Sequence, residues 1–192
     1  MRAVSNTTIG VCLLAVLLVS GCGASATGSA RSAAATAGLR QIALTSPAIT
    51  GTSIAIPARY TCDGGDVSMP LRWSTVPHTT REVLVVLFSV EPANRGRVTD
   101  TAQWVVAGLP PGVHQLAAGR LPPGALVGRD AAGRTRYSIC PPRGAHASYL
   151  MVVFASPQKL EHSAGFSDAS AWAKLRQIRP PYGVMPAAYW RA

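Results

Sequence analysis

Residues that could perform catalysis or bind a metal are sparse in this sequence. Residues 51–55 (GTSIA) begin like the nucleophile elbow of serine hydrolases but lack its final glycine. The sequence contains no phosphate-binding loop, dinucleotide fingerprint or zinc-protease motif. Zinc is not expected, because there is no Cys-x-x-Cys pair and only His146 lies near Cys140. Glu91 and His146 could exchange a proton, but nothing supplies a nucleophile, so we expect no enzyme, no cofactor and no metal.

The N-terminal cysteines point to a different chemistry. An apolar run at 9–19 follows Arg2 and is too short for a membrane-spanning helix of about twenty residues. It leads into Ser20-Gly21-Cys22, which resembles the bacterial lipobox. There the thiol is diacylated with palmitate-type chains, the peptide is cut before the cysteine, and the new amine is acylated. The pattern predicts a lipoprotein signal peptide over 1–21 and a lipidated Cys22; the alternative is a secreted protein in which Cys22 is incidental.

The composition extends this prediction to the whole chain. Residues 22–40 are nearly all Ala, Ser, Gly and Thr and predict a flexible tether, followed by one domain over 41–192. The 48% hydrophobic and 14% charged residues exclude a coiled coil and a mainly disordered chain. The net charge of +10 is scattered, which indicates a solvated cationic surface or attraction to an anionic membrane, and no nucleic acid. We expect export and anchoring to the extracytoplasmic face of a bacterial cell membrane.

Apolar runs separated by Gly and Pro predict a mainly β domain. Residues 82–90 form a continuous β-branched and aromatic run, typical of a strand buried on both faces. A helix is expected over 168–178, with Ser167 or Asp168 as its cap and Pro180 beyond its end. The other expected elements are strands at 42–49, 54–60, 103–109 and 149–155, and a loop at 116–133.

Cys62 and Cys140 remain in the mature chain. An exported protein folds in an oxidising compartment, where two cysteines can form a disulfide. Two buried thiols that pack as small hydrophobic groups are the alternative, and the sequence leaves both open.

Three motifs stand in a fixed order along the chain. The first spans 60–73 (YTCDGGDVSMPLRW), the second joins Glu91-Pro92-Ala93 to Gln103-Trp104, and the third spans 137–149 (YSICPPRGAHASY). Together they resemble the phosphatidylethanolamine-binding protein family, in its bacterial Raf-kinase-inhibitor-like branch. Their order and spacing agree with the family over about residues 42–156. The resemblance implies a large antiparallel sheet packed with a smaller sheet and minor C-terminal helices.

The resemblance also implies a small anion pocket near one end of the sheet. Family members bind phosphate-like groups there, including phospholipid head groups, and most are binding or inhibitory modules. The positions that carry over are Glu91, Pro92, Gln103, Trp104, Tyr137, Cys140, Pro141, His146 and Tyr149. The tryptophans are also typical core residues. We interpret His78, His114 and His162 as exposed.

Several of these positions depart from the family pattern. Glu91 replaces an aspartate, Ala93 replaces a second aspartate, and Gln103 replaces a histidine. Gln is always a neutral donor, whereas His gains charge near neutral pH, so Gln103 should weaken phosphate affinity and flatten its pH dependence. Two functions stay open: a lipoprotein that binds a small anionic or phosphorylated ligand, and an exported protein–protein module that inhibits a protease or kinase and has a vestigial pocket.

Overall fold

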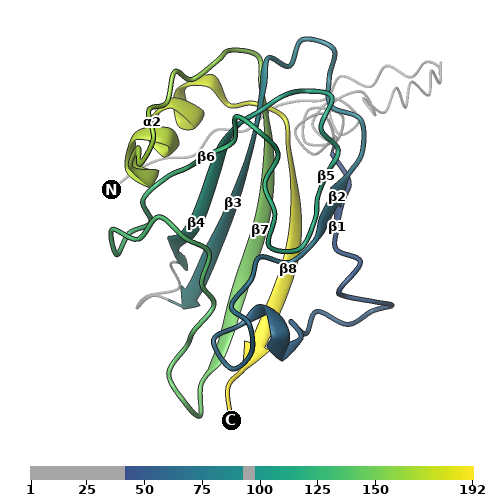
Figure 1. Cartoon of the computed structure of the whole chain (residues 1–192), viewed down its shortest axis with the longest axis vertical. Helices are drawn as coiled ribbons and strands as arrows, with labels where there is room; N and C mark the ends of the chain where they lie inside the picture. Colours follow the sequence, from purple (N-terminus) through teal and green to yellow (C-terminus); the bar gives the residue numbers. More distant parts are fainter. Residues whose placement is uncertain (1–41, 93–97) are drawn as a thin grey trace, which may run out of the picture.

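Long antiparallel strands form the larger of two sheets in the computed structural model, which describes residues 42–92 and 98–192. Its order is β6-β4-β3-β7-β8, and the long members stand side by side in Figure 1. The bounds are β3 Glu82–Pro92, β4 Val98–Leu109, β6 Leu126–Val127, β7 His146–Ser156 and β8 Tyr182–Trp190. The expected mainly β fold, with a large antiparallel sheet, is therefore confirmed.

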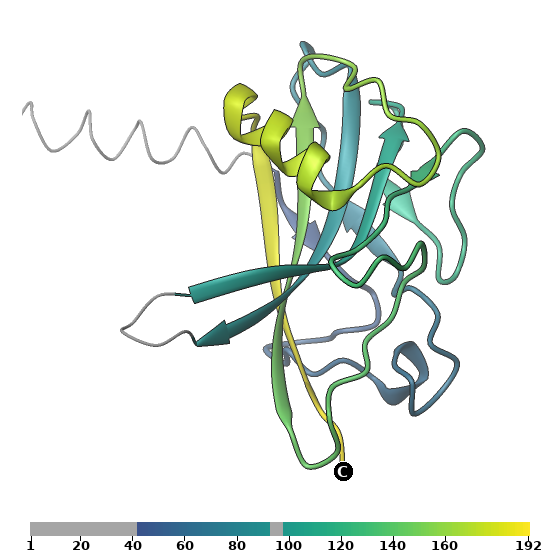
Figure 2. The ribbon, with the colours of Figure 1, turned by 90° about the vertical axis from the view of Figure 1, so that its left-hand side faces the viewer.

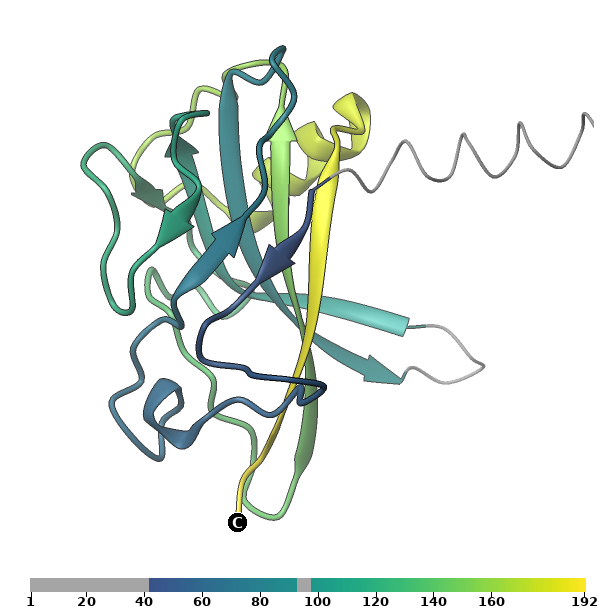
Figure 3. The ribbon, with the colours of Figure 1, turned by 90° about the vertical axis from the view of Figure 1, so that its right-hand side faces the viewer.

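A smaller sheet packs on one face of this large sheet. It has the order β1-β2-β5 and lies beside β8 and β7 in Figure 3. Its strands are β1 Leu44–Thr45, β2 Leu71–Trp73 and β5 Gln115–Leu116. Leu71 and Met69 are fully buried in the core that they share with Leu87 and Met151 of the large sheet.

Helix α2 (Asp168–Ile178) covers the opposite face, as Figure 2 shows. The Ser167 side chain accepts a hydrogen bond from the Ser170 amide, and Leu175 is buried against the sheet. The helix and its cap at Ser167 are therefore confirmed. This second core explains the continuous apolar run of β3: Val83, Val85 and Leu87 face the small sheet, whereas Leu84, Val86 and Phe88 face α2.

The remaining elements differ from expectation in several places. Residues 54–60 form one parallel bridge, Ala55 with Ala188, and the 3₁₀ helix η1 (Ala58–Tyr60) instead of a strand. The strand expected at 42–49 is limited to β1, Leu44–Thr45. The loop expected at 116–133 contains the end of β5 and all of β6. Strand β8 was not expected; Pro186 is tolerated because β8 is the last strand of its sheet. Where the resemblance implied C-terminal helices, the described chain after residue 156 forms one helix, α2, which is followed by β8.

The strand register gives the large sheet two distinct ends. Glu82 pairs with Ser156 at one end, and His146 pairs with Trp190 at the other. The described chain begins at the first end, where the Ile42 backbone packs against Gly183 so closely that no Cβ fits there. Both apolar cores lie within residues 42–187.

The predicted signal peptide and tether lie outside the described residues. In the part of the chain that is described, no helix is long and apolar enough to cross a membrane.

Candidate ligand-binding site

A groove of about 720 Å³ opens at the end of the sheet where β7 begins. In Figure 2 the far ends of β3 and β4 turn away from β7 and β8 at this end. Residues of β3, β4, β7 and the preceding loop line the groove. These residues are Ser89, Val90, Glu91, Gln103, Cys140, Pro141, Pro142, Ala145, His146, Ala147, Ser148 and Tyr149.

Tyr149 and Glu91 provide a donor and a carboxylate on neighbouring strands. Tyr149 is 4% exposed, and Glu91 lies at the exposed end of β3. Burial, with a smaller contribution from the negative charge of Glu91, raises the pKa of Tyr149 to about 12. The phenol therefore stays protonated at physiological pH and can donate a hydrogen bond to an anion.

Gln103 ends a hydrogen-bonded chain that comes from the protein interior. Its Nε2 donates to Ser89 Oγ at 3.0 Å, and its Oε1 accepts from Arg134 Nη2 at 3.2 Å. Arg134 Nε in turn donates to Asp130 Oδ2 at 2.7 Å, and Asp130 is buried. This chain fixes the orientation of the Gln103 amide, with its NH₂ group toward Ser89 and the groove wall.

His146 lines the groove, and its strand partner Trp190 stacks on it at the end of the β7–β8 pair. Their rings stack with centroids 5.1 Å apart and an interplanar angle of 9°. Trp190 is 61% exposed, which is high for a tryptophan. The stack holds the imidazole at the groove mouth and presents a large apolar ring to the solvent.

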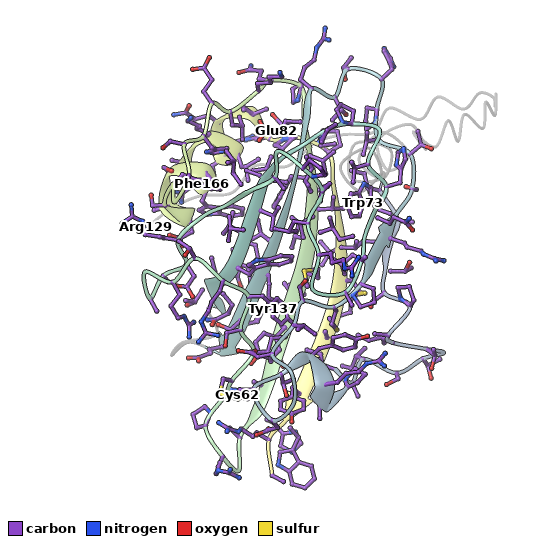
Figure 4. All side chains as sticks on the ribbon, viewed as in Figure 1. Cys62, Trp73, Glu82, Arg129, Tyr137 and Phe166 are labelled. Atoms are coloured by element: carbon purple, nitrogen blue, oxygen red, sulfur yellow. A yellow bond between two sulfur atoms is a disulfide. The ribbon has the colours of Figure 1, made fainter. Side chains whose placement is uncertain are left out.

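A disulfide between Cys62 and Cys140 forms part of the wall. Figure 4 places Cys62 near the end of the molecule opposite Glu82. The structure thus decides between the disulfide and the two buried thiols that the sequence left open. Cys140 is exposed even though it is bonded to Cys62.

Two aspartates tie the loop around Cys62 to this wall. Asp63 accepts hydrogen bonds from Tyr189 Oη at 2.7 Å and Arg191 Nε at 2.9 Å. The bond from Tyr189, followed by the bond and charge of Arg191, holds the pKa of Asp63 below its usual value. Asp66 bonds Arg136, the Ser138 hydroxyl and the Ile139 amide.

Most of the residues that the sequence singled out meet at this groove. Glu91, Gln103, Cys140, Pro141, His146 and Tyr149 all line it. Trp104 and Tyr137 are 3% and 6% exposed and pack edge to face in the core, so they support the site and do not line it. Pro92 pairs with Val98 at the end of β3, and its side chain lies outside the described part.

Sequence reasoning missed other residues at this end of the molecule. Ser89 and Ser148 lie on the strands that carry Glu91 and Tyr149, so strand neighbours of the motif residues were the available signal. No such signal existed for Trp190 and Arg191, because β8 was not predicted. His162, expected to be exposed, is half-buried and stacks on Phe166 at 4.1 Å. Among the residues described, no group of His, Cys, Asp and Glu could hold a metal.

Comparison with known proteins identifies the family to which the chain belongs. The model for the phosphatidylethanolamine-binding protein family matches residues 45–179, well over half of the chain. The chain belongs to this family. The family takes its name from the binding of phosphatidylethanolamine.

Individual relatives agree with this assignment. A UPF0098 protein of Methanothermobacter thermautotrophicus is 35% identical over 58% of this chain and 75% of its own. LppC, a candidate lipoprotein of Mycobacterium tuberculosis, is 29% identical over 64% of this chain and 59% of its own length.

Solved structures show the same fold. A candidate phosphatidylethanolamine-binding protein homologue from Chlamydia trachomatis has a TM-score of 0.68 at 25% identity, covering 79% of this chain and 98% of its own. Escherichia coli YbcL, described as a member of the mammalian family, also has a TM-score of 0.68, at 22% identity, over 79% of this chain and 99% of its own.

Proposed function

We propose that this protein is an exported, membrane-anchored lipoprotein whose domain binds a small phosphorylated ligand, with a phospholipid head group as the first candidate. The main support is the groove at the end of the sheet where β7 begins, because residues of two separate family motifs meet there. The anchor is supported by the Ser20-Gly21-Cys22 pattern and by the similarity to LppC.

The groups in the groove suit a ligand that carries both a negative and a positive charge. The Tyr149 phenol and the Gln103 amide are neutral donors, and His146 becomes a charged donor when it is protonated. These three groups can bind phosphate oxygens. Glu91 adds an acceptor that disfavours a bare anion but can bind an ammonium group. A phosphorylethanolamine group, with phosphate and ammonium two carbons apart, matches this set better than inorganic phosphate.

Binding requires no covalent step. The Ser89 hydroxyl in the groove bonds the Thr101 carbonyl and the Gln103 amide, neither of which is a base that could activate it. We therefore infer a binding protein and not an enzyme.

Calorimetric titration of residues 41–192 with phosphorylethanolamine and with inorganic phosphate tests this function. We expect saturable binding, a loss of about tenfold in affinity for both ligands in His146→Ala, and no change in His78→Ala, a histidine outside the groove. Glu91→Gln should weaken phosphorylethanolamine and strengthen inorganic phosphate. The absence of saturable binding to the parent protein would remove the ligand-binding function.

An exported protein–protein module, inhibiting a protease or kinase, is the second candidate. The exposed Trp190 ring favours it, because tryptophan is enriched in the energetic centres of protein interfaces. A captured partner that is lost with Trp190→Ala but retained with His146→Ala and Glu91→Gln would support this candidate over the first.

A further inference from the structure

The disulfide between Cys62 and Cys140 differs from a purely structural crosslink in its surroundings. Cys140 is exposed and lines the groove, and Cys62 is half-exposed. Disulfides that resist reduction are usually buried, whereas exposed ones are the labile or regulatory class. An external thiol can therefore reach this bond in the folded protein.

Arg191 lies directly against one sulfur of this bond. Its Nη1 is 3.3 Å from Cys140 Sγ, and its side chain is only 19% exposed. A guanidinium at this distance favours the thiolate over the thiol. Asp63 offsets part of this charge because it is paired with Arg191, and Glu91 lies in the same groove wall as Cys140. The charged group in direct contact with Cys140 Sγ is nevertheless the Arg191 guanidinium.

Arg191 also connects the same two segments that the disulfide joins. Its Nε donates to Asp63, next to Cys62, and its Nη1 donates to the carbonyl of Pro141, next to Cys140. Tyr189 adds a bond to Asp63. The two segments therefore stay tied together by Arg191 and Tyr189 when the S–S bond is broken.

Taken together, the geometry points to a reversible thiol-exchange site in the groove wall, at which Cys140 is the leaving sulfur and Arg191 stabilises it. The reductant is a thiol, either a low-molecular-weight thiol or a reducing protein of the cell envelope. Its thiolate attacks Cys62 Sγ, and the electron pair of the S–S bond moves to Cys140 Sγ, which leaves as a thiolate beside Arg191. A second thiolate then attacks the external sulfur of the mixed disulfide, and Cys62 leaves and takes a proton. Two thiols are oxidised to one external disulfide, and their two electrons reduce the protein.

Reduction would change the groove, and this consequence rests on the proposed ligand binding. A Cys140 thiolate adds a negative charge to a wall that already contains Glu91. Like charges repel a phosphate group, so the reduced protein should bind it several-fold more weakly.

The test uses the full-length protein purified from membranes of an expressing bacterium. It is equilibrated in glutathione buffers of graded ratio, and the oxidation state of the Cys62 and Cys140 peptides is read by differential alkylation and mass spectrometry. We expect reduction with an unchanged near-ultraviolet circular dichroism spectrum. In Arg191→Gln the equilibrium constant for reduction should fall about tenfold, which is about 30 mV for a two-electron couple.

Arg136→Gln is the matched control, because Arg136 also pairs with an aspartate of the 61–66 loop but makes no contact with the sulfur atoms. It should leave the equilibrium unchanged. Equal shifts in both variants, or reduction that occurs only as the spectrum is lost, would overturn the exchange site.

A second measurement does not depend on the folding of a variant. In the reduced parent protein, the pH midpoint for alkylation should be lower at Cys140 than at Cys62. A Cys140 midpoint at or above the ordinary thiol value of about 8.5 would overturn the role of Arg191. Phosphorylethanolamine titrations of the oxidised and reduced forms then test the coupling; no binding to either form would count against the proposed function and leave the thiol chemistry standing.

Discussion

Two glutamates on the same strand show how differently the two ends of the large sheet are used. Glu82 opens β3 and is 5% exposed, while Glu91 lies nine positions later and is exposed on the groove. Glu82 Oε1 accepts from the Gly108 amide at 2.8 Å, and Oε2 accepts from the Leu160 amide at 2.7 Å. In Figure 4, Glu82 and Cys62 mark these opposite ends.

The comparison teaches that burial, more than residue type, decides the role of a carboxylate here. The oxygens of Glu82 fix the end of β4 and the connection between β7 and α2, beside a smaller hollow of about 390 Å³. At the groove end the strands separate, and Glu91 faces a volume large enough for a ligand. Glu82 holds segments of the fold together at one end, and the larger hollow, with Glu91, lies at the other.

The largest expected effect separates the two glutamates by stability. Glu82→Ala leaves two backbone N–H groups without their acceptor, at about 1–3 kcal/mol each, so the free energy of unfolding should fall by about 3 kcal/mol. Glu91→Ala should lower it by less than Glu82→Ala does, because the Glu91 side chain is exposed. Urea unfolding followed by tryptophan fluorescence measures both. Equal losses in the two variants would contradict a division of labour between the two ends.

A smaller effect is expected when the groove end is made more like its family. Gln103→His places a titratable donor beside Ser89 and removes the acceptor of Arg134. Inorganic phosphate should then bind about fivefold more tightly at pH 5.5 than at pH 7.5, in addition to any pH dependence of the parent protein, because a charged donor is about 1 kcal/mol stronger. Calorimetry at the two pH values measures it. An unchanged pH dependence would mean that position 103 does not face the ligand.

The smallest effect concerns His162, at the end of the sheet that carries Glu82. Burial lowers the pKa of His162; the charge of Glu82 opposes this shift, and the charge of Lys174 adds to it. The unfolded chain, with a histidine pKa of about 6.5, therefore binds a proton that the folded protein does not, so stability falls as the pH drops below about 6.5.

His162→Phe keeps the stack on Phe166 and removes this titration. The parent protein loses unfolding free energy between pH 7 and pH 5, and in His162→Phe this loss should be smaller by less than about 1 kcal/mol. His78→Phe, at an exposed position, is the control and should leave the loss unchanged. A loss that does not shrink in His162→Phe would show that other groups cause the acid sensitivity.

The sequence predicted the elements whose local pattern agrees with their burial. Residues 83–88 are apolar throughout because β3 packs on both faces, and Ser167 caps α2 as its residue type favours. Strand β8 was missed because Gly183 and Pro186 weaken its local signal. Its stability comes from pairing with β7, which is far away in the sequence.

The site was predicted only in part for a similar reason. Motif residues such as Glu91 and His146 could be found by their spacing, and both line the groove. The burial of Trp104 and Tyr137 depends on how strands from distant segments pack, and the position of Arg191 depends on the unpredicted β8. Local spacing cannot supply either kind of information.

The bonds from Tyr189 and Arg191 to Asp63 span 126 and 128 positions, and they set a time order for biogenesis. At about 10 residues per second, Asp63 is synthesised on the order of ten seconds before its partners. The disulfide partner of Cys62, Cys140, likewise follows it by 78 positions. The groove is therefore the last part of the domain to mature, and a nascent chain arrested before Tyr189 would carry both apolar cores but an unfinished binding wall.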